Sequence, residues 1–386
     1  MVKRRRVALA LELEWFYRYT LDVFAGAQEY ARQCERWECV IDPYPELSMH
    51  AKGPARAYDG IIARATPALA AAARRAGVPL VNVRYDGPAI DAPLVVPDSE
   101  AGGRMAVEHL LARGFKTVSY IGYCARGDKV MLRGIREALT KAGFSCAKPL
   151  LVSERYAARP ENWRKFSARL NEWMDGWSLP MGICAGYDLL ARYVANACEH
   201  RGWNVPRDVA LVGSCDEPLV CNHPNPSLTS IDFGYDRVGY RAAELLDEMM
   251  DGAPAPRQPV LVQPSALIPR QSTDALVVDD KTVAAALRFI AEHGHEPIRV
   301  SHVAKSLHLT RRTLERRFRA ALRRSIADEI VRLRVERAKR RLAEDSTPFK
   351  RLAAELGFGD AERMCAVFKR VEGVTPRVYR RNHRRE

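Results

Sequence analysis

Short apolar runs alternate with helical periodicity over the first two-thirds of the chain. Val107, Leu110 and Leu111 recur at the spacing of one helix face, and Gly114 follows where a left-handed cap would end that helix. Short apolar runs between polar residues favour buried strands instead. These runs are Val7–Leu11, Glu38–Ile41, Gly60–Ala63, Pro79–Val83 and Thr117–Ile121.

The same alternation starts a second cycle near Thr117. It continues through a strand at Met181–Ala185, a helix that carries Leu189 and Tyr193, and a strand at Val209–Val212. Strands that alternate with helices over such a length predict parallel, doubly wound sheets. We therefore expect two α/β lobes in residues 1–273.

The last part of the chain has a helical pattern throughout. Ser301 offers an N-cap for a helix over 303–307, and after a tight turn Thr310 offers a cap for a helix that carries Leu314 and Phe318. A short helix, a turn and a second helix are the layout of a helix-turn-helix motif.

This layout occurs twice. We expect Thr347-Pro348 to open the second copy as cap and first-turn proline, and Asp360 to cap a helix that carries Met364 and Phe368. A long basic helix, roughly 326–343, joins the copies. The corresponding positions are Ala304 and Ala353, Leu307 and Leu356, Leu309 and Phe358, and Phe318 and Phe368.

The positive charge of the chain is confined to this helical part. The whole sequence has 61 Lys and Arg against 47 Asp and Glu, and residues 281–386 alone hold 27 against 13. The net charge of +14 therefore lies entirely in the last part, and the rest is neutral in sum. A neutral body with a compact basic domain is typical of proteins that bind polyanions, most often nucleic acid.

Composition limits the other classes of function. No apolar run approaches the ~20 residues that cross a bilayer, and the first apolar run is too short for a signal peptide. Nine scattered cysteines without a C-x-x-C pair indicate neither a disulfide framework nor a zinc site. We expect a cytoplasmic protein that has no membrane-spanning segment and binds no metal or cofactor. We do not expect an enzyme, because the phosphate-loop, zinc-protease and nucleophile-elbow motifs are missing.

Polar side chains follow the ends of several predicted strands. Ligands of open α/β sheets bind beyond the carboxyl ends of the strands, and a sugar needs hydrogen-bonding groups together with an aromatic face. Asp188 also suits a helix cap, and Trp15 also suits a surface or dimer contact. The candidate ligand-binding residues are Glu12, Trp15, Arg64, Asp98, Arg133, Asp188 and Asp216.

Several segments of the first part resemble, in order, the sugar-binding domains of the LacI/GalR family. They are Val96-Pro97-Asp98, 106–110, Gly114-Phe115, 120–122, 206–213, 225–231 and 260–273. The resemblance implies a two-lobed, periplasmic-binding-protein-like sensor that closes on a small sugar and forms a homodimer. Cys215 stands where the family usually has Asp, and Tyr187 where it often has Asn. These differences leave open a different sugar or another class of small molecule.

The last part resembles the DNA-binding domain of the AraC/XylS family. The resemblance is carried by Leu352-Ala353-x-x-Leu356-Gly357-Phe358 and by Val367-Phe368-Lys369-Arg370-x-x-Gly373-x-Thr375-Pro376-x-x-Tyr379-Arg380. It implies binding to double-stranded operator DNA and activation through contact with RNA polymerase.

Two arginines on the first recognition helix face the same way. Arg312 and Arg316 lie four residues apart and can enter a major groove together to pair with guanines, or else contact phosphates or only water. Glu315 either accepts a hydrogen bond from cytosine or holds Arg311 in place. The full set of candidate DNA-binding residues is Thr310, Arg311, Arg312, Glu315, Arg316, Asp360, Ala361, Glu362 and Arg363.

The interpretation that unites these features is a ligand-responsive transcription regulator, with a pentose-like sugar as effector. Its parts are a sensor over 1–273, a linker over 274–280 and an all-α DNA-binding domain over 281–386. Three alternatives remain: the same architecture with another effector, a transport-type binding protein, and an architectural nucleic-acid protein. The last of these gives no role to the large neutral body.

Overall fold

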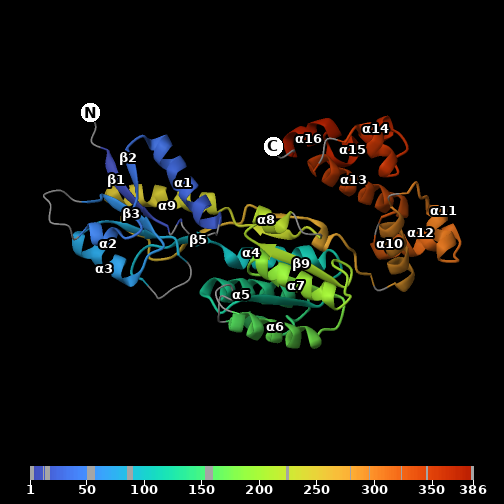
Figure 1. Ribbon diagram of the computed structural model, residues 1–386, viewed down its shortest axis with the longest axis horizontal. Helices are drawn as coiled ribbons and strands as arrows, with labels where there is room; N and C mark the ends of the chain where they lie inside the picture. Colours follow the sequence, from blue (N-terminus) through green and yellow to red (C-terminus); the bar gives the residue numbers. More distant parts are fainter. Residues whose placement is uncertain are drawn as a thin grey trace. The chain divides into compact units, whose positions relative to one another are not determined.

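The computed structural model describes residues 4–11, 13, 18–49, 57–84, 90–152, 160–222, 226–278, 280–294, 296–322, 324–344 and 347–383. The chain forms two compact units, Met1–Ala275 and Leu276–Glu386 (Figure 1). Among the described residues, no helix is long and apolar enough to cross a membrane.

The first lobe of the first unit is built on a parallel sheet of order β2-β1-β3-β4. Its strands are β1 (Arg5–Ala10), β2 (Trp37–Ile41), β3 (Gly60–Ala63) and β4 (Leu80–Asn82), and its early helices are α1 (Arg18–Cys34), α2 (Pro45–Ser48) and α3 (Pro67–Ala76). A much later helix, α9 (Tyr235–Met250), packs beside α1 (Figure 1). The two helices meet at glycines, because a Cβ on Gly26 would lie 1.8 Å from the carbonyl oxygen of Asp236.

The second lobe is built on a larger sheet of order β12-β10-β9-β8-β6-β7, in which only β12 is antiparallel to its neighbour. Its strands are β6 (Val118–Tyr123), β7 (Leu150–Val152), β8 (Met181–Ala185), β9 (Val209–Ser214), β10 (Thr229–Asp232) and β12 (Ala266–Ile268). Its helices are α4 (Ser99–Leu111), α5 (Arg126–Lys141), α6 (Pro160–Asp175), α7 (Asp188–His200) and α8 (Pro218–Cys221).

The chain passes between the lobes three times. β5 (Val95–Pro97) pairs with β11 (Val260–Val262), and the chain enters the second lobe after each of them, while α9 takes it back to the first lobe. β6, near Thr117, is the first strand of the second lobe along the chain, but α4 before it already packs on α5 and β8 and so belongs to this lobe. Periodicity identifies a helix but not the sheet that it covers. Gly114 has φ +86°, as its expected cap requires.

The described residues of the second unit form helices and the turns between them, around two hydrophobic cores. Its helices are α10 (Lys281–His293), α11 (Val300–Ser306), α12 (Arg311–Leu322), α13 (Ile326–Glu344), α14 (Phe349–Glu355), α15 (Ala361–Glu372) and α16 (Pro376–His383). α13 belongs to both cores: Ile330 lies in the first, with Phe318, and Leu342 lies in the second, with Phe368. The predicted pair of helix-turn-helix motifs joined by one long helix is confirmed.

Two of the expected caps are wrong. α11 begins before Ser301, because the side chain of His302 accepts a hydrogen bond from the backbone N of Arg299, which takes the cap position. At the second copy Pro348 is itself the cap of α14, and Thr347 lies outside the helix. The caps are thus displaced by a residue or two, but the helices are those that the apolar pattern predicts.

Candidate ligand cavity and nucleic-acid interface

A cavity lies between the lobes of the first unit, where the chain passes from one to the other. With its open mouth it encloses about 790 Å³ of space, a size that suits a small molecule. The first lobe contributes Tyr19 and Arg64, and the second contributes Tyr120 and Asp128. The remaining polar or aromatic wall comprises Thr20, Ser99, Tyr187, Cys215, Phe233 and Tyr235.

Asp128 is a buried carboxyl group in the wall of this cavity. Its Oδ1 accepts a 2.5 Å hydrogen bond from the hydroxyl of Tyr120. Burial, together with the charge of Asp128, raises the pKa of Tyr120 well above its ordinary value, so the phenol stays protonated as a donor. Cβ atoms on Gly122 or Gly186 would lie 2.2 Å from Oδ1 of Asp128, so both positions need glycine to make room for the carboxyl group.

Arg64 is held against aromatic side chains on the opposite wall. Its Nη1 donates a 3.3 Å hydrogen bond to the hydroxyl of Tyr19, and its guanidinium lies 5.7 Å from the centre of that ring. The Tyr19 ring in turn lies 5.2 Å from the ring of Tyr235. The cavity thus offers a cation on one side, a carboxyl group on the other and aromatic faces between them.

Of the predicted ligand-binding residues, the structure brings Arg64 to the cavity. Glu12 and Trp15 lie outside the described residues. Asp98 instead caps α4 by accepting a hydrogen bond from the backbone N of Ala101 at 2.8 Å. Arg133 is exposed and forms an ion pair with Glu100.

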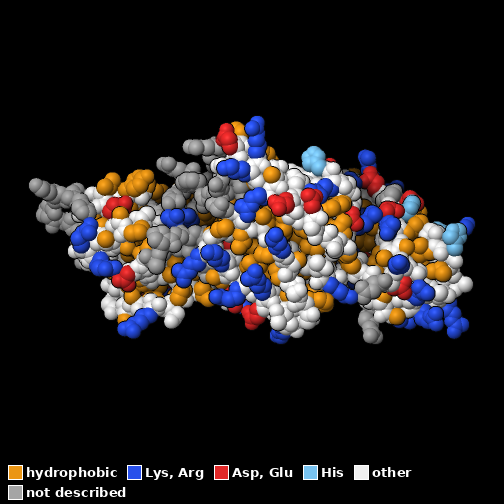
Figure 2. Space-filling view, turned by 90° about the horizontal axis from the view of Figure 1, so that it is seen from below, with side chains coloured by type: hydrophobic (Ala, Val, Ile, Leu, Met, Phe, Trp, Pro, Cys, Tyr) orange, Lys and Arg blue, Asp and Glu red, His pale blue; other side chains and the backbone are white. Residues whose placement is uncertain are grey.

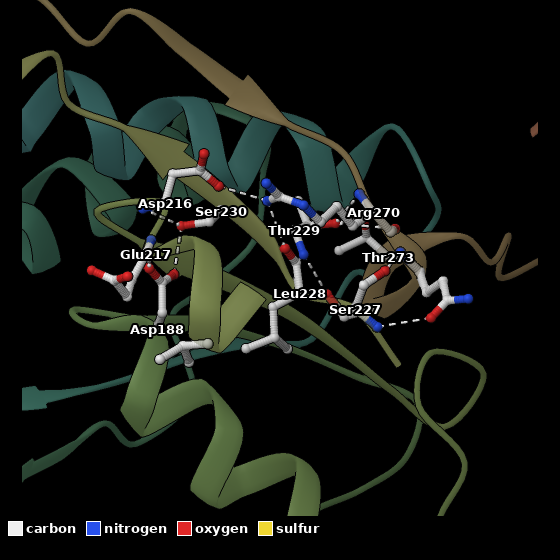
Figure 3. A network of polar contacts seen from close by, with 12 residues as sticks. Asp188, Asp216, Glu217, Ser227, Leu228, Thr229, Ser230, Arg270 and Thr273 are labelled. Carbon is white, nitrogen blue, oxygen red and sulfur yellow. Dashed lines mark hydrogen bonds and ion pairs between the residues drawn. The ribbon is translucent and has the colours of Figure 1, made fainter. Parts of the chain in front are cut away.

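Asp188 and Asp216 belong to a polar network beside the cavity, drawn in Figure 3. Asp188 accepts hydrogen bonds from the hydroxyl of Ser230 at 2.5 Å and from the backbone N of Glu217 at 2.8 Å. Burial raises its pKa to about 7, although these hydrogen bonds oppose the shift. Asp216 forms a 2.6 Å ion pair with Arg270.

The acidic group that does line the cavity, Asp128, is not among the predicted residues. Asp128 follows the strand that ends at Tyr123, so the rule of strand ends already contained the signal. Tyr120 lies inside that strand, where an aromatic side chain is more often core than site. In the described part of the chain, no three His, Cys, Asp or Glu side chains lie together as metal ligands.

In the second unit, α12 presents a basic face opposite a buried one. Leu314 and Phe318 are fully buried, while Arg312 and Arg316 are exposed. Thr310 accepts a hydrogen bond from the backbone N of residue 313, which confirms its role as a cap. The other two candidates on this helix, Glu315 and Arg311, form an ion pair at 2.7 Å. In this structure Glu315 therefore holds Arg311, which is one of its two predicted roles.

α15 repeats this arrangement. Asp360 caps the helix by accepting a 2.7 Å hydrogen bond from the backbone N of Arg363. Glu362 and the side chain of Arg363 are exposed, and Ala361 is half-buried. Lys and Arg side chains gather at the end of the view in Figure 2 where α11 and α12 lie. α12 and α15 therefore each present an exposed polar N-terminal turn above buried side chains.

Comparison with known proteins gives matches to both units. Residues 107–273 match a periplasmic binding protein-like domain, and residues 303–382 match a helix-turn-helix domain. The chain is 27% identical over 290 residues to the xylose operon regulatory protein of Haemophilus influenzae, covering 75% of each chain. It is 30% identical over 230 residues to the protein of that name from Escherichia coli K12, covering 60% of this chain and 59% of that one.

Solved structures share the fold. A xylose-binding transcription activator covers the whole of both chains with a TM-score of 0.70 at 24% identity. A transcriptional regulator in complex with cellobiose covers 70% of this chain and 86% of that one, with a TM-score of 0.56 at 23% identity. In its two domains and in their order, this chain is a xylose-regulator-like transcription factor, with a periplasmic-binding-protein-like domain followed by a helix-turn-helix DNA-binding domain.

Proposed function

We propose that the first unit binds xylose or another pentose and that this binding controls the affinity of the second unit for operator DNA. The observation that carries the proposal is the cavity wall, which combines Arg64, Asp128 and several tyrosines. Carboxylate and guanidinium groups bind sugar hydroxyls, and aromatic faces cover the apolar side of a sugar ring. The names of the relatives favour a pentose within this class.

A sugar in this cavity contacts both lobes at once. Arg64 and Tyr19 belong to the first lobe, and Asp128 and Tyr120 to the second. A ligand that bridges them binds better to one arrangement of the lobes than to any other, and it shifts the population toward that arrangement by this difference in affinity. The chain passages between the lobes are the places where such a change is absorbed.

On the DNA side, α12 and α15 act as the two recognition helices. Each enters a major groove with its N-terminal turn, and successive grooves on one face of the duplex lie ~34 Å apart. Arg312 and Arg316 are the base-contacting pair on α12, with Arg363 as their counterpart on α15. The regulator acts in the cytoplasm as a homodimer on adjacent half-sites and activates transcription through contact with RNA polymerase.

Sugar binding is tested by urea unfolding of the full chain with xylose, arabinose, ribose and glucose. A sugar at 100 times its Kd stabilises the folded protein by ~2.7 kcal/mol. The variant Arg64→Gln should bind the sugar roughly 10- to 100-fold more weakly, because a hydrogen bond from a charged donor is lost. If no sugar stabilises the chain while another class of small molecule does, the effector assignment is wrong and the architecture stands.

DNA binding is tested with a duplex that the protein selects from a random-sequence pool. Arg316→Ala should weaken binding to this duplex roughly 5- to 150-fold, the value of one bidentate base contact. Arg288→Ala removes the same charge from an exposed position on α10, outside both recognition helices. Equal losses in the two variants would mean that Arg316 contributes only charge and reads no base.

A further inference from the structure

The turn after β9, which reaches the wall of the cavity at Cys215, carries two unusual backbone conformations. Cys215 has φ +91° and Asp216 has φ +49°, and neither residue is glycine. Such conformations persist only where the surrounding structure imposes them, and they concentrate at functional sites. Here the backbone N of Cys215 donates to the carbonyl of Ile231 at 2.9 Å, and that of Asp216 donates to the hydroxyl of Ser230 at 3.0 Å. Cys215 lines the cavity.

The side chain of Asp216 leads from this turn to Arg270, on the segment after β12 (Figure 3). The two side chains are 20% and 13% exposed, so solvent screens their 2.6 Å ion pair less than a surface pair. Arg270 also donates to the carbonyl of Leu228 at 2.9 Å, and its backbone N donates to the hydroxyl of Thr229 at 2.8 Å. The ion pair thus joins the turn to a residue that is also held by β10 and the residue before it.

Three residues further on, Thr273 is fully buried and held by three contacts. Its hydroxyl lies 2.7 Å from that of Thr229 and 2.8 Å from Nε2 of His109, and its carbonyl accepts a 2.8 Å hydrogen bond from Nε of Arg113. Thr273 precedes the boundary at Ala275, after which the chain continues into the second unit. The root of the connection to the DNA-binding unit is thus fixed to the second lobe.

α4 gives this root a second connection to the cavity. Ser99, its first residue, lines the cavity, while His109 in its last turn and Arg113, two residues after its end, contact Thr273. The helix has 13 residues and spans roughly 20 Å at 1.5 Å per residue. A rigid helix and the Asp216–Arg270 pair therefore meet at one segment, 270–273.

We propose that Asp216 and Arg270 are coupling residues, which transmit the state of the cavity to the connection between the units. This inference rests on the proposed function. A ligand that displaces Cys215 changes the turn, and the ion pair carries the change to segment 270–273. The role is positional, because Cys215 lines the cavity and its neighbour Asp216 is paired with Arg270 beside it. Two sites joined in this way have a reciprocal coupling free energy.

The test compares the full-length wild type with Asp216→Asn, Arg270→Gln and the double variant. For each protein, fluorescence anisotropy gives the Kd for the selected duplex with and without saturating xylose, and calorimetry gives the Kd for xylose alone. Allosteric ratios are typically ~5- to 150-fold. We expect the ratio to fall toward 1 in both single variants and no further in the double variant, because the pair acts as one unit. Both separate affinities should stay at their wild-type values.

The control is Asp91→Asn, which breaks an exposed ion pair with Arg74 at 2.8 Å in the first lobe. Arg270→Lys keeps the charge and serves if Arg270→Gln fails to fold. A wild-type ratio in the folded variants would overturn the coupling role, as would an equal loss in the control. Weaker xylose binding by Asp216→Asn would make it a ligand contact instead. A ratio of 1 in the wild type with every pentose would overturn the proposed function itself, and the inference with it.

Discussion

The stability of the first unit should decrease as the pH rises toward neutrality, because of one buried carboxyl group. The side chain of Asp188 is 3% exposed, at the start of α7. Burial raises its pKa from 3.8 to about 7, although Ser230 and the backbone of Glu217 donate hydrogen bonds to it. In the folded chain the neutral form is favoured, whereas in the unfolded chain the group ionises at its ordinary pKa.

The sign and size of the effect follow from this difference. Between pH 4 and pH 7 the folded state binds more protons than the unfolded state, so the free energy of unfolding falls as the pH rises. The pKa of Asp188 changes by about three units, and each unit is worth 1.36 kcal/mol, so the full loss is about 4 kcal/mol. Of this, about 2.5 kcal/mol falls between pH 5 and pH 8.

The assay is urea unfolding at pH 5 and pH 8, followed by tryptophan fluorescence. All six tryptophans precede residue 204, so their emission reports on the first unit alone. The comparison is with Asp188→Asn, which cannot ionise. Its amide can accept only one of the two hydrogen bonds, which lowers the free energy of unfolding by about 1 kcal/mol at either pH. The difference between pH 5 and pH 8 should therefore shrink by about 2.5 kcal/mol in the variant. Equal pH differences in the two proteins would refute the raised pKa.

Two further substitutions test the packing of each unit. Phe318→Ala should destabilise the second unit by about 3–5 kcal/mol, because it empties a fully buried position. Circular dichroism should then show melting of the second unit at a lower temperature, with no change in tryptophan emission at that temperature. A simultaneous change in emission would contradict independent unfolding of the two units. Gly26→Ala should lower the stability of the first unit by about 1–3 kcal/mol or more, since its Cβ would meet the backbone of α9. Gly176→Ala is the control, because its Cβ would lie 3.7 Å from the nearest atom, the carbonyl oxygen of Trp173. Equal urea midpoints for the two alanine variants would contradict the close contact between α1 and α9.

The architecture was largely predictable because its signals are local. Gly60–Ala63 and Met181–Ala185 form strands with the predicted bounds, since a short apolar run between polar residues buries itself in either sheet. The assignment of helices to lobes was not predictable in the same way. α4 and α9 both lie between strands in the sequence, yet α9 packs on the first lobe although it follows a strand of the second. That choice depends on contacts such as Gly26 with Asp236, which join segments about 210 residues apart.

The exposed side chains of α12 could be predicted from the sequence, whereas the residues of the cavity could not, because only the former depend on local signals. On α12 a single amphipathic helix determines which side chains are buried and which are exposed, so Arg312 and Arg316 could be placed from spacing alone. The cavity draws Tyr19, Arg64 and Asp128 from different elements and from both lobes. Each of these residues is ordinary in its own segment, and only the three passages of the chain between the lobes bring them together.

The acidic candidates beside the cavity were displaced by one position in a regular way. Tyr187 lines the cavity where Asp188 was expected, Cys215 does so beside Asp216, and Asp98 stands between two residues that line it. Adjacent residues at the end of a strand point to opposite sides. At these turns a backbone N–H group donates a hydrogen bond to the carboxylate: that of Ala101 to Asp98, and that of residue 217 to Asp188. The acids therefore turn into the protein, and their neighbours face the cavity. Asp98, Asp188 and Asp216 thus support the site from behind its wall, whereas Asp128, in the first turn of α5, belongs to the wall itself.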